Sequence, residues 1–385
     1  MKITKTIEEI NTRIAKGEAI VMTAEEIIPL VEDIGIKEAT RRVDVVTTGT
    51  FGAMCSSGVF LNFGHSDPPI KMKKILLNKV NAYGGLAAVD TYLGATEQSE
   101  DNPSYGGAHV IEDLIAGKQI TLEASAHATD CYPRREIKTN ISINDINEAF
   151  LFNPRNAYQN YAAATNSTNK IIHTYMGTLL PNLSNVTYAT AGELSPLLND
   201  PTFQTIGLGT RIFIGGTTGY VAWNGTQHNT TKPCNDWSIP IGGGGTLSLI
   251  GNLKEMSTEY IRAATYHNYG TSLLVGVGIP IPLLSEEITK ATSISNKNIY
   301  TKVFDYGHAT LNRPDFGMFS YADLQSGKIT INGKNINTSP LCSISKARQI
   351  AETLKEWIVN GKFLLSTPVA SLQKGEYIKQ LNIKE

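Results

Sequence analysis

The sequence predicts an α/β protein with mixed sheets, in which strands and helices alternate along the chain. Runs of β-branched or alternating apolar residues, such as residues 43–48 and 120–126, are typical of strands. Apolar residues at helical spacing, as in residues 3–17 and 345–360, indicate amphipathic helices. With 41% hydrophobic residues the chain can bury a sizeable core, and no linker marks a domain boundary. We therefore expect a single domain over residues 1–385, with or without two lobes.

Capping patterns place the first helices. Thr6 and Glu9 form a capping-box pattern at the start of the first helix, and Thr23 with Glu26 predicts a second helix that is kinked at Pro29. The elements expected next are a helix at 71–80, a strand at 86–92, a helix from 107 to 117 and a strand at 120–126.

Periodicity and turn residues place the later elements. The Asn- and Tyr-rich residues 144–200 predict helices but carry few chemical signals. Ile329 and Ile331 alternate before Asn332-Gly333, which predicts a surface hairpin. The other expected elements are glycine-broken strands from 211 to 250, a helix at 256–269, a buried strand at 273–277 and a last helix at 345–360 that ends before Gly361.

Charge and composition exclude several classes of partner. The net charge is −1 and charges of both signs are interspersed, so we expect no binding to nucleic acid or to an anionic membrane. The most apolar run, residues 272–284, is shorter than the roughly 20 residues of a membrane span. Because the N-terminus is a charged amphipathic segment and not a signal peptide, we expect a cytoplasmic protein.

The four cysteines do not follow a metal-binding pattern. They stand at positions 55, 131, 234 and 342 and form no C-x-x-C pair. The sequence therefore predicts neither a zinc ribbon nor an iron–sulfur cluster, and we expect no metal site in this chain.

Cys55 lies in a glycine-rich stretch, residues 49–72, directly after the strand expected at 43–48. Side chains in loops after strand ends commonly carry the chemistry of α/β folds. Gly49, Gly52 and Gly58 would let the backbone take positive φ and let another group approach closely. The alternative is a tight turn around a small buried cysteine.

Cys131 repeats this setting after the strand at 120–126. Arg134 and Arg135 follow it, and a nearby guanidinium favours the nucleophilic thiolate over the thiol. His127 is a weak candidate for a general base. The alternative is a buried cysteine followed by two solvated arginines.

Two glycine runs suggest anion-binding nests, at residues 215–216 and 242–245. Such runs are more often turns between strands, and neither matches a P-loop or a dinucleotide fingerprint.

Several motifs together resemble the homocysteine-biosynthesis protein family. They are residues 49–72, S-Y-G-G-A-H-V-I-E-D-L around His109, A-T-D-C-Y-P-R-R around Cys131, G-Y-V-A-W-N-G-T-Q-H and V-G-V-G-I-P-I-P. The best-understood members are L-aspartate semialdehyde sulfurtransferases of methanogenic archaea and other anaerobes. Some relatives continue into a pair of regulatory domains of the cystathionine-β-synthase type, for which this sequence leaves no room, so we expect none here.

The resemblance implies that sulfide sulfur is incorporated into L-aspartate semialdehyde to give L-homocysteine, for methionine biosynthesis. It implies Cys131 as the persulfide carrier and Cys55 as its helper. The implied partners are L-aspartate semialdehyde, sulfide or a sulfur carrier, and a small ferredoxin-like protein with iron–sulfur clusters. No cofactor bound by this chain is expected. We also expect a homo-oligomer, whose size the sequence does not indicate.

The implied reaction consumes two electrons, because an aldehyde and sulfide become a thiol and water. Two thiols can supply these electrons by ending as a disulfide, with Cys55 resolving a persulfide on Cys131 by thiol–disulfide exchange. That scheme requires the two sulfurs to meet, although 76 positions separate them.

The substrate also needs partners for its amino and carboxylate groups. Arg134 and Arg135 are candidates for the carboxylate, and His65, Asp67 and His109 are polar candidates without an assigned role. Two rival functions stay open: a non-catalytic module that binds phosphate or nucleotide, and another cysteine-nucleophile transferase that forms a thioester.

Overall fold

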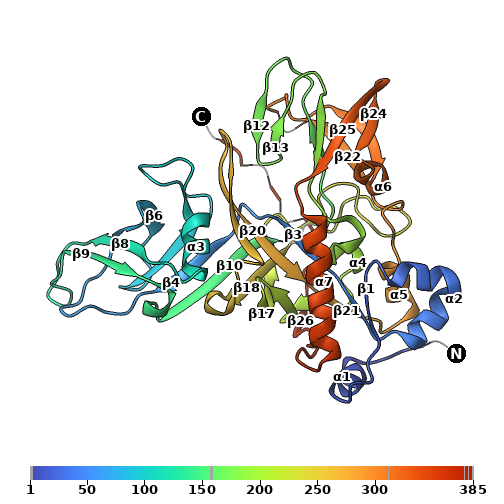
Figure 1. Ribbon diagram of the computed structural model, residues 1–385, viewed down its shortest axis with the longest axis horizontal. Helices are drawn as coiled ribbons and strands as arrows, with labels where there is room; N and C mark the ends of the chain where they lie inside the picture. The colour runs from blue at the N-terminus through green and yellow to red at the C-terminus, as the bar shows by residue number, and fades with distance from the viewer. Residues whose placement is uncertain (1–2, 157–158, 311, 377, 380, 384–385) are drawn as a thin grey trace.

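The protein is described here by a computed structural model covering residues 3–156, 159–310, 312–376, 378–379 and 381–383. Figure 1 shows a long twisted sheet through the middle of the molecule, with a second sheet and most of the helices on one side of it. The predicted α/β class with mixed sheets is confirmed.

The outer half of the long sheet forms an arm, which we define as residues 58–141 (Figure 1). Neighbouring strands of the arm are all antiparallel. Their order across the sheet is β4 (Gly58–Asn62), β7 (Asp90–Gly94), β6 (Val80–Tyr83), β5 (Lys74–Leu77), β8 (Ile120–Ser125) and β9 (Glu136–Ile141). Helix α3 (Gly107–Ile115) buries Val110, Ile111 and Leu114 in the core.

The inner half of the long sheet carries the first cysteine motif. It continues from β4 through β10 (Glu148–Asn156), β18 (Leu247–Asn252), β17 (Thr217–Asn224), β16 (Arg211–Ile214), β20 (Gly270–Gly278) and β19 (Ile261–Tyr266). Strand β3 (Thr50–Ala53) pairs antiparallel with β20 beside this path. Thus the end of β3 lies where the inner half of the sheet meets the arm.

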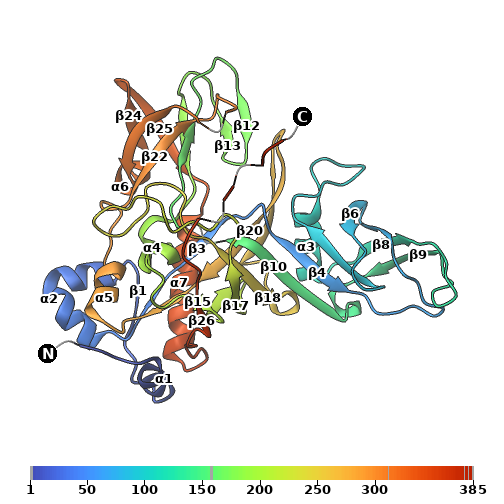
Figure 2. The same ribbon diagram turned by 180° about the vertical axis from the view of Figure 1, so that it is seen from behind.

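A second sheet stands over one end of the long sheet (Figure 2). Its order is β23 (Asp315–Ser320), β22 (Tyr300–Asp305), β11 (Ala163–Thr165), β14 (Asn185–Tyr188), β25 (Lys334–Pro340) and β24 (Lys328–Ile331). The small sheets are β1 (Val21–Thr23), β2 (Val45–Thr47) and β21 (Pro280–Pro282), the hairpin β12 (Ile172–Thr174) and β13 (Gly177–Leu179), and the pair β15 (Gly207–Leu208) and β26 (Ala370–Ser371).

The remaining helices flank the sheets. They are α1 (Ile7–Ala15), α2 (Ile27–Arg42), α4 (Pro196–Asn199), α5 (Glu286–Thr292), α6 (Tyr321–Gln325) and α7 (Ile344–Val359), with short 3₁₀ turns at Ile143–Asp145, Gly192–Leu194 and Leu253–Glu255. Helix α7 packs Ile350, Leu354 and Ile358 into a core cluster with Phe51 of β3. This contact braces the strand that leads to Cys55. None of the helices in the described ranges is long and apolar enough to cross a membrane.

Elements with two independent local signals are confirmed. The reciprocal bonds of Thr6 and Glu9 begin α1, and the Asn332-Gly333 turn joins β24 to β25. The strands expected near residues 45, 120 and 275 are β2, β8 and β20, and the helices expected at 107 and 345 are α3 and α7. The glycine-broken strands after residue 211 are β16 to β18.

Several expected helices are wrong. Residues 71–80 form β5 and the turn to β6, because Asn78 and Lys79 adopt the left-handed conformation of a tight hairpin. Residues 256–269 mainly form β19 and its turn. Residues 144–200 carry strands β10 to β14 and their connections, and the helices described in this range are the short α4 and 3₁₀ turns. In each case pairing with a neighbouring strand overrides a weak local preference.

The second helix also differs from its prediction. Thr23 and Glu26 exchange the predicted hydrogen bonds, but Thr23 ends β1 and the helix begins at Ile27. Pro29 stands in the first turn, where a helix needs no N–H from that residue. The irregular residue is Gly35, at φ 76°.

Candidate active site

Cys55 occupies the turn between β3 and β4, at the junction of the arm with the inner sheet. Its position is fixed from both sides. The Met54 N–H donates to Leu273 O of β20 at 2.7 Å, and the Ser57 N–H donates back to Met54 O at 2.9 Å. The half-buried thiol thus sits just past the end of β3, a strand that lies within the stretch expected to be a glycine-rich loop after the strand at 43–48.

The glycines around this turn act through close contact and not through positive φ. A Cβ at Gly49 would lie 2.1 Å from Ala347 O of α7, and one at Gly58 would lie 2.2 Å from the Tyr92 hydroxyl. None of Gly49, Gly52 and Gly58 has positive φ, and a Cβ at Gly52 would meet its nearest atom at an ordinary 3.7 Å, which corrects those parts of the expectation. Helix α7 and β7 can therefore press directly onto the cysteine-bearing segment.

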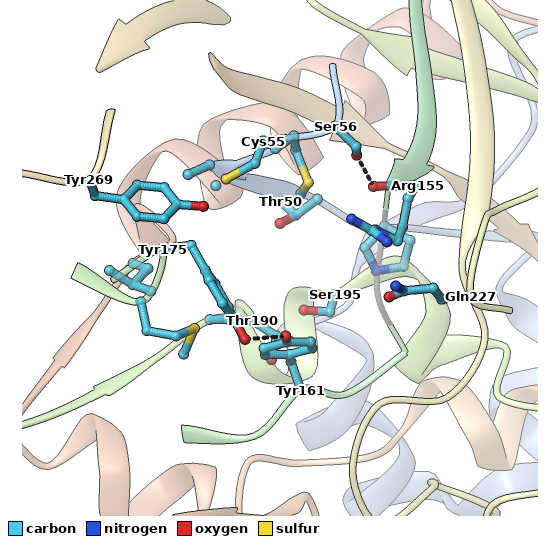
Figure 3. A pocket seen from close by; sticks show the side chains of 17 residues that line it. Thr50, Cys55, Ser56, Arg155, Tyr161, Tyr175, Thr190, Ser195, Gln227 and Tyr269 are labelled. Atoms are coloured by element: carbon cyan, nitrogen blue, oxygen red, sulfur yellow. Dashed lines mark hydrogen bonds between the residues drawn. The ribbon is translucent and has the colours of Figure 1, made fainter. Parts of the chain in front are cut away.

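A cavity of about 320 Å³ opens beside Cys55 (Figure 3). Its walls come from β3, the end of β10, the β12–β13 turn and the β19–β20 turn. Its polar and aromatic lining residues are Thr50, Cys55, Ser56, Arg155, Tyr161, Tyr175, Thr190, Ser195, Gln227 and Tyr269.

Arg155 is the single charged side chain among the described residues that line the cavity. Its backbone is held in place, since Ser56 Oγ donates to Arg155 O at 2.9 Å and the Arg155 N–H donates to Asn153 Oδ1 at 3.0 Å. The ion pairs found in the described part of the chain do not involve its guanidinium. The cavity therefore offers a thiol and a cation to a ligand.

Hydroxyl groups surround the Cys55 sulfur. Ser272 Oγ donates to Cys55 Sγ at 3.4 Å. Burial, and then the nearby Cys55 sulfur, raise the pKa of Tyr269 to about 12. Tyr269 thus stays protonated near neutral pH, so its hydroxyl is available as a hydrogen-bond donor beside the sulfur.

Three tyrosine hydroxyls meet at the far side of the cavity. Tyr161 and Tyr175 are hydrogen-bonded at 3.1 Å, and Tyr175 and Tyr306 at 2.9 Å. Burial, and then Tyr175, raise the pKa of Tyr306 well above its ordinary value. Arg313 lies over the Tyr306 ring, 4.0 Å from its centroid.

Cys131 lies elsewhere, exposed on the loop between β8 and β9. Arg134 Nε donates to Pro68 O at 2.9 Å and its Nη2 donates to Asp67 O at 2.7 Å, while Tyr132 stacks on His65. Five of the predicted site residues therefore gather around this loop: Cys131, Arg134, Asp67, His65 and the exposed Arg135.

The structure does not bring Cys55 and Cys131 together. Strands β4 and β8 run in the same direction, so Cys55 before β4 and Cys131 after β8 lie at opposite ends of the arm. Four inter-strand steps of about 4.8 Å, roughly 19 Å in all, also separate these strands. A disulfide needs Cα atoms within about 7 Å, so the two-thiol scheme is not satisfied within one chain in this conformation.

A model of the family described as "Homocysteine biosynthesis enzyme, sulfur-incorporation" matches residues 19–365. The chain belongs to this family. The L-aspartate semialdehyde sulfurtransferase of Methanosarcina acetivorans is 53% identical over 97% of this chain and 73% of the relative. The protein of the same name from Methanocaldococcus jannaschii is 53% identical over 97% of this chain and 74% of the relative. No solved structure matches significantly.

His109, the remaining candidate, is part of the α3 N-terminus in this family member. Its Nδ1 accepts the Gly106 N–H at 3.2 Å, and its Nε2 lies 3.5 Å from Thr265 Oγ1. Tyr105 stacks on the ring. His109 does not line the Cys55 cavity, and its contacts describe a helix cap.

The other two cysteines differ from Cys55 and Cys131. Cys342 is buried behind β3, where its sulfur accepts the Phe51 N–H at 3.4 Å, and burial raises its pKa. Cys234 is exposed, and partial burial of its sulfur raises its pKa as well. Raised pKa values keep both thiols protonated and weakly nucleophilic.

Most residues of the cavity carry no specific signal in the sequence. Arg155, Tyr161 and Tyr175 lie in the segment for which helices without chemistry were expected, and Tyr269 was assigned to a helix. The tyrosine enrichment of residues 144–200 was the available signal. The glycine run at 215–216 forms the turn between β16 and β17, as the plainer interpretation predicts, and the run at 242–245 lies in the irregular connection between β17 and β18.

Proposed function

We propose that this chain transfers sulfur to L-aspartate semialdehyde to form L-homocysteine, and that the reaction takes place in the Cys55 cavity. The observation that carries the proposal is the pairing of a thiol with a single guanidinium in a cavity of about 320 Å³. The names of the two relatives at 53% identity support the choice of substrate.

Arg155 binds the substrate carboxylate. A guanidinium holds a carboxylate through two parallel hydrogen bonds, which fixes the direction of the rest of the molecule. Arg155 and Cys55 both point into the cavity (Figure 3), so a short amino acid held by Arg155 can present its aldehyde carbon to the thiol. Arg134, the earlier candidate, is engaged with two backbone carbonyls.

Cys131 receives the sulfur as a persulfide and passes it to Cys55. In that transfer the Cys55 thiolate attacks the outer sulfur, one S–S bond forms on Cys55 and one breaks on Cys131. The positions of the two thiols favour this order over resolution by Cys55, because Cys131 is exposed to a donor while Cys55 lines the cavity. The transfer requires movement of the loop at residues 126–135 or the approach of a second chain.

The electrons balance with an external donor. Loading sulfide onto the Cys131 thiol as a persulfide releases two electrons and two protons, and the electrons pass to the oxidised form of the external donor, a disulfide or an oxidised iron–sulfur protein. Conversion of the Cys55 persulfide and the aldehyde to homocysteine, the free thiol and water takes up four of each. The net demand is two electrons, which we assign to an iron–sulfur protein of the ferredoxin class.

The test is homocysteine formation under anaerobic conditions from L-aspartate semialdehyde, sulfide and a reduced ferredoxin or dithiol. We expect continuous turnover with the reductant and less than one homocysteine per chain without it, because the two separated thiols of one chain cannot supply the electrons by forming a disulfide. Absence of product with every reductant would refute the proposed reaction. Sustained turnover with sulfide alone would refute the electron balance but not the choice of substrate.

A further inference from the structure

We infer that tyrosine rings, and not a carboxylate, recognise the α-ammonium group of the substrate in the Cys55 cavity. This rests on the proposed function. Enzymes often bind an amino-acid ammonium group with Asp or Glu, but neither occurs among the described lining residues of this cavity. Three tyrosines line it instead: Tyr161, Tyr175 and Tyr269.

The Tyr175 and Tyr269 rings form one recess. Their centroids are 6.3 Å apart and the planes are inclined by 59°. A cation is attracted to a tyrosine face within about 6 Å of the centroid, so one ammonium group can lie within range of both rings. The hydroxyls of Tyr161 and Tyr175, joined at 3.1 Å, add acceptor oxygens at the edge of the recess.

The recess is formed by residues from three segments, of which the β19–β20 turn is distant in sequence from the other two. Tyr175 stands in the β12–β13 turn, where Thr187 Oγ1 donates to Met176 O at 2.7 Å. Tyr269 stands in the β19–β20 turn, and Tyr161 precedes β11. Rings fixed in this way need little ordering when a ligand binds.

The recess also lies on the correct side for the substrate. In Figure 3 Tyr269 and Tyr175 face the cavity from the side opposite Arg155, with Cys55 and Ser56 above. When the substrate carboxylate binds Arg155, an ammonium group that points toward Arg155 is repelled by the guanidinium. Turned toward the tyrosines, the ammonium group meets the negative faces of the rings.

Glu97 is the competing acidic residue. It lines an outer cleft that shares Cys55, Arg155 and Tyr269 with the cavity. One carboxylate oxygen of Glu97 already accepts the Tyr83 hydroxyl at 2.8 Å. A role of Glu97 in binding the ammonium group is therefore the alternative that the experiment has to separate.

The experiment compares two ligands that differ only in the amino group. Calorimetry measures the binding of L-homocysteine and of 4-sulfanylbutanoate to the full chain under reducing conditions. We expect homocysteine to bind about tenfold more tightly to the wild type. Tyr175→Leu and Tyr269→Leu should reduce the ratio to less than about threefold, and Tyr269→Phe should keep most of it, because the ring remains.

Matched variants complete the design. Two substitutions serve as controls: Glu97→Gln, and Tyr220→Leu at an exposed tyrosine outside the cavity. Each should leave the ratio of the two ligand affinities within about twofold of the wild type. Tyr269 is 40% exposed in a turn, so its substitution should not unfold the protein. The inference is wrong if Glu97→Gln abolishes the ratio, if the tyrosine variants weaken both ligands equally, or if the wild type does not discriminate.

This readout is independent of turnover. Discrimination in binding without homocysteine formation would refute the proposed reaction and leave the recognition of the ammonium group standing. Turnover without discrimination in binding would refute the recognition of the ammonium group by the tyrosines and leave the proposed reaction standing.

Discussion

The Cys55 turn and the Cys131 loop look alike in sequence and differ in the fold. Each cysteine follows a strand, but Cys55 is half-buried at a cavity whereas Cys131 is exposed. The difference comes from the neighbours of each strand. Strand β3 is paired with β20 and packed under α7, while β8 has only the largely exposed β9 between it and the end of the sheet.

This contrast separates two tasks that one cysteine would combine poorly. A thiol that accepts sulfur from another molecule has to be accessible, and a thiol that reacts with an aldehyde benefits from an enclosed site. The exposed Cys131 fits the first task and Cys55 fits the second.

The largest effect is expected from the two cysteines. Cys55→Ser and Cys131→Ser should each lower homocysteine turnover by about 10³-fold or more, because a serine hydroxyl cannot carry a persulfide sulfur. Anaerobic product assays measure the loss. Cys234→Ser is the control and should keep turnover within about twofold. If Cys131→Ser turned over like the wild type, the loop would not be the sulfur carrier.

A smaller loss is expected at Arg155. Arg155→Gln should lower kcat/KM for L-aspartate semialdehyde about 100-fold, mainly through KM, since a charge-assisted pair to the carboxylate is lost. Arg155→Lys should lose about tenfold, because lysine keeps the charge but not the two-pronged geometry. Arg134→Gln serves as the matched control with less than about threefold change. A larger effect at Arg134 would move the carboxylate site to the Cys131 loop.

The separation of the two thiols can be tested by oxidation. After brief diamide treatment of the free protein, peptide mapping should find a Cys55–Cys131 disulfide in less than about a tenth of the chains. The reason is that roughly 19 Å of sheet separates β4, which follows Cys55, from β8, which precedes Cys131. A parallel sample with bound L-homocysteine tests whether a ligand changes this. Rapid and complete pairing within one chain would show that the two loops meet readily and would restore the direct two-thiol scheme.

Local chemistry explains which parts of the fold were predictable. Helices α1, α3 and α7 and the β24–β25 hairpin carry caps or turn residues whose geometry is decided within a few positions. The apolar residues near 75 and 261 fit helix or strand equally. Hairpin turns at 78–79 and 267–269 pair them with β6 and β20, and β5 also pairs with the distant β8. The pairing with β8 is not encoded in a short window.

In the candidate site, too, the residues with distinctive sequence neighbours were predictable and those brought together by the fold were not. Cys55 and Cys131 could be found because glycine and arginine neighbours mark them in sequence. Arg155, Tyr175 and Tyr269 could not, because they meet only when β10, the β12–β13 turn and the β19–β20 turn converge. The placement of Arg134 against Asp67 and Pro68 likewise depends on contacts across 66 and 67 positions.

A modest stability effect is expected at that contact. Arg134→Gln should lower the free energy of unfolding by about 1 kcal/mol, since two charge-assisted bonds to carbonyls are lost at an exposed site. Urea denaturation measures the change, and the adjacent Arg135→Gln should change it by less than about 0.5 kcal/mol. Equal effects at the two arginines would mean that the hydrogen bonds from Arg134 to Asp67 O and Pro68 O do not stabilise the loop between β8 and β9.

The smallest effect concerns pH and His109. Burial lowers the pKa of this imidazole, and the opposing influence of Glu112 and then Asp113 is smaller. The unfolded chain therefore takes up a proton first, near pH 6.5, so the free energy of unfolding should fall as the pH drops below that value. Protonation would also remove the Nδ1 lone pair that accepts the Gly106 N–H. Between pH 7 and pH 5 the wild type should thus lose more stability than His109→Gln, by less than about 1 kcal/mol because solvent screens the partly exposed imidazole, as measured by urea denaturation of both proteins at each pH. Taking the difference between the two proteins removes the contribution of the other titrating groups. An equal or larger loss in His109→Gln would show that the fold does not hold this histidine neutral.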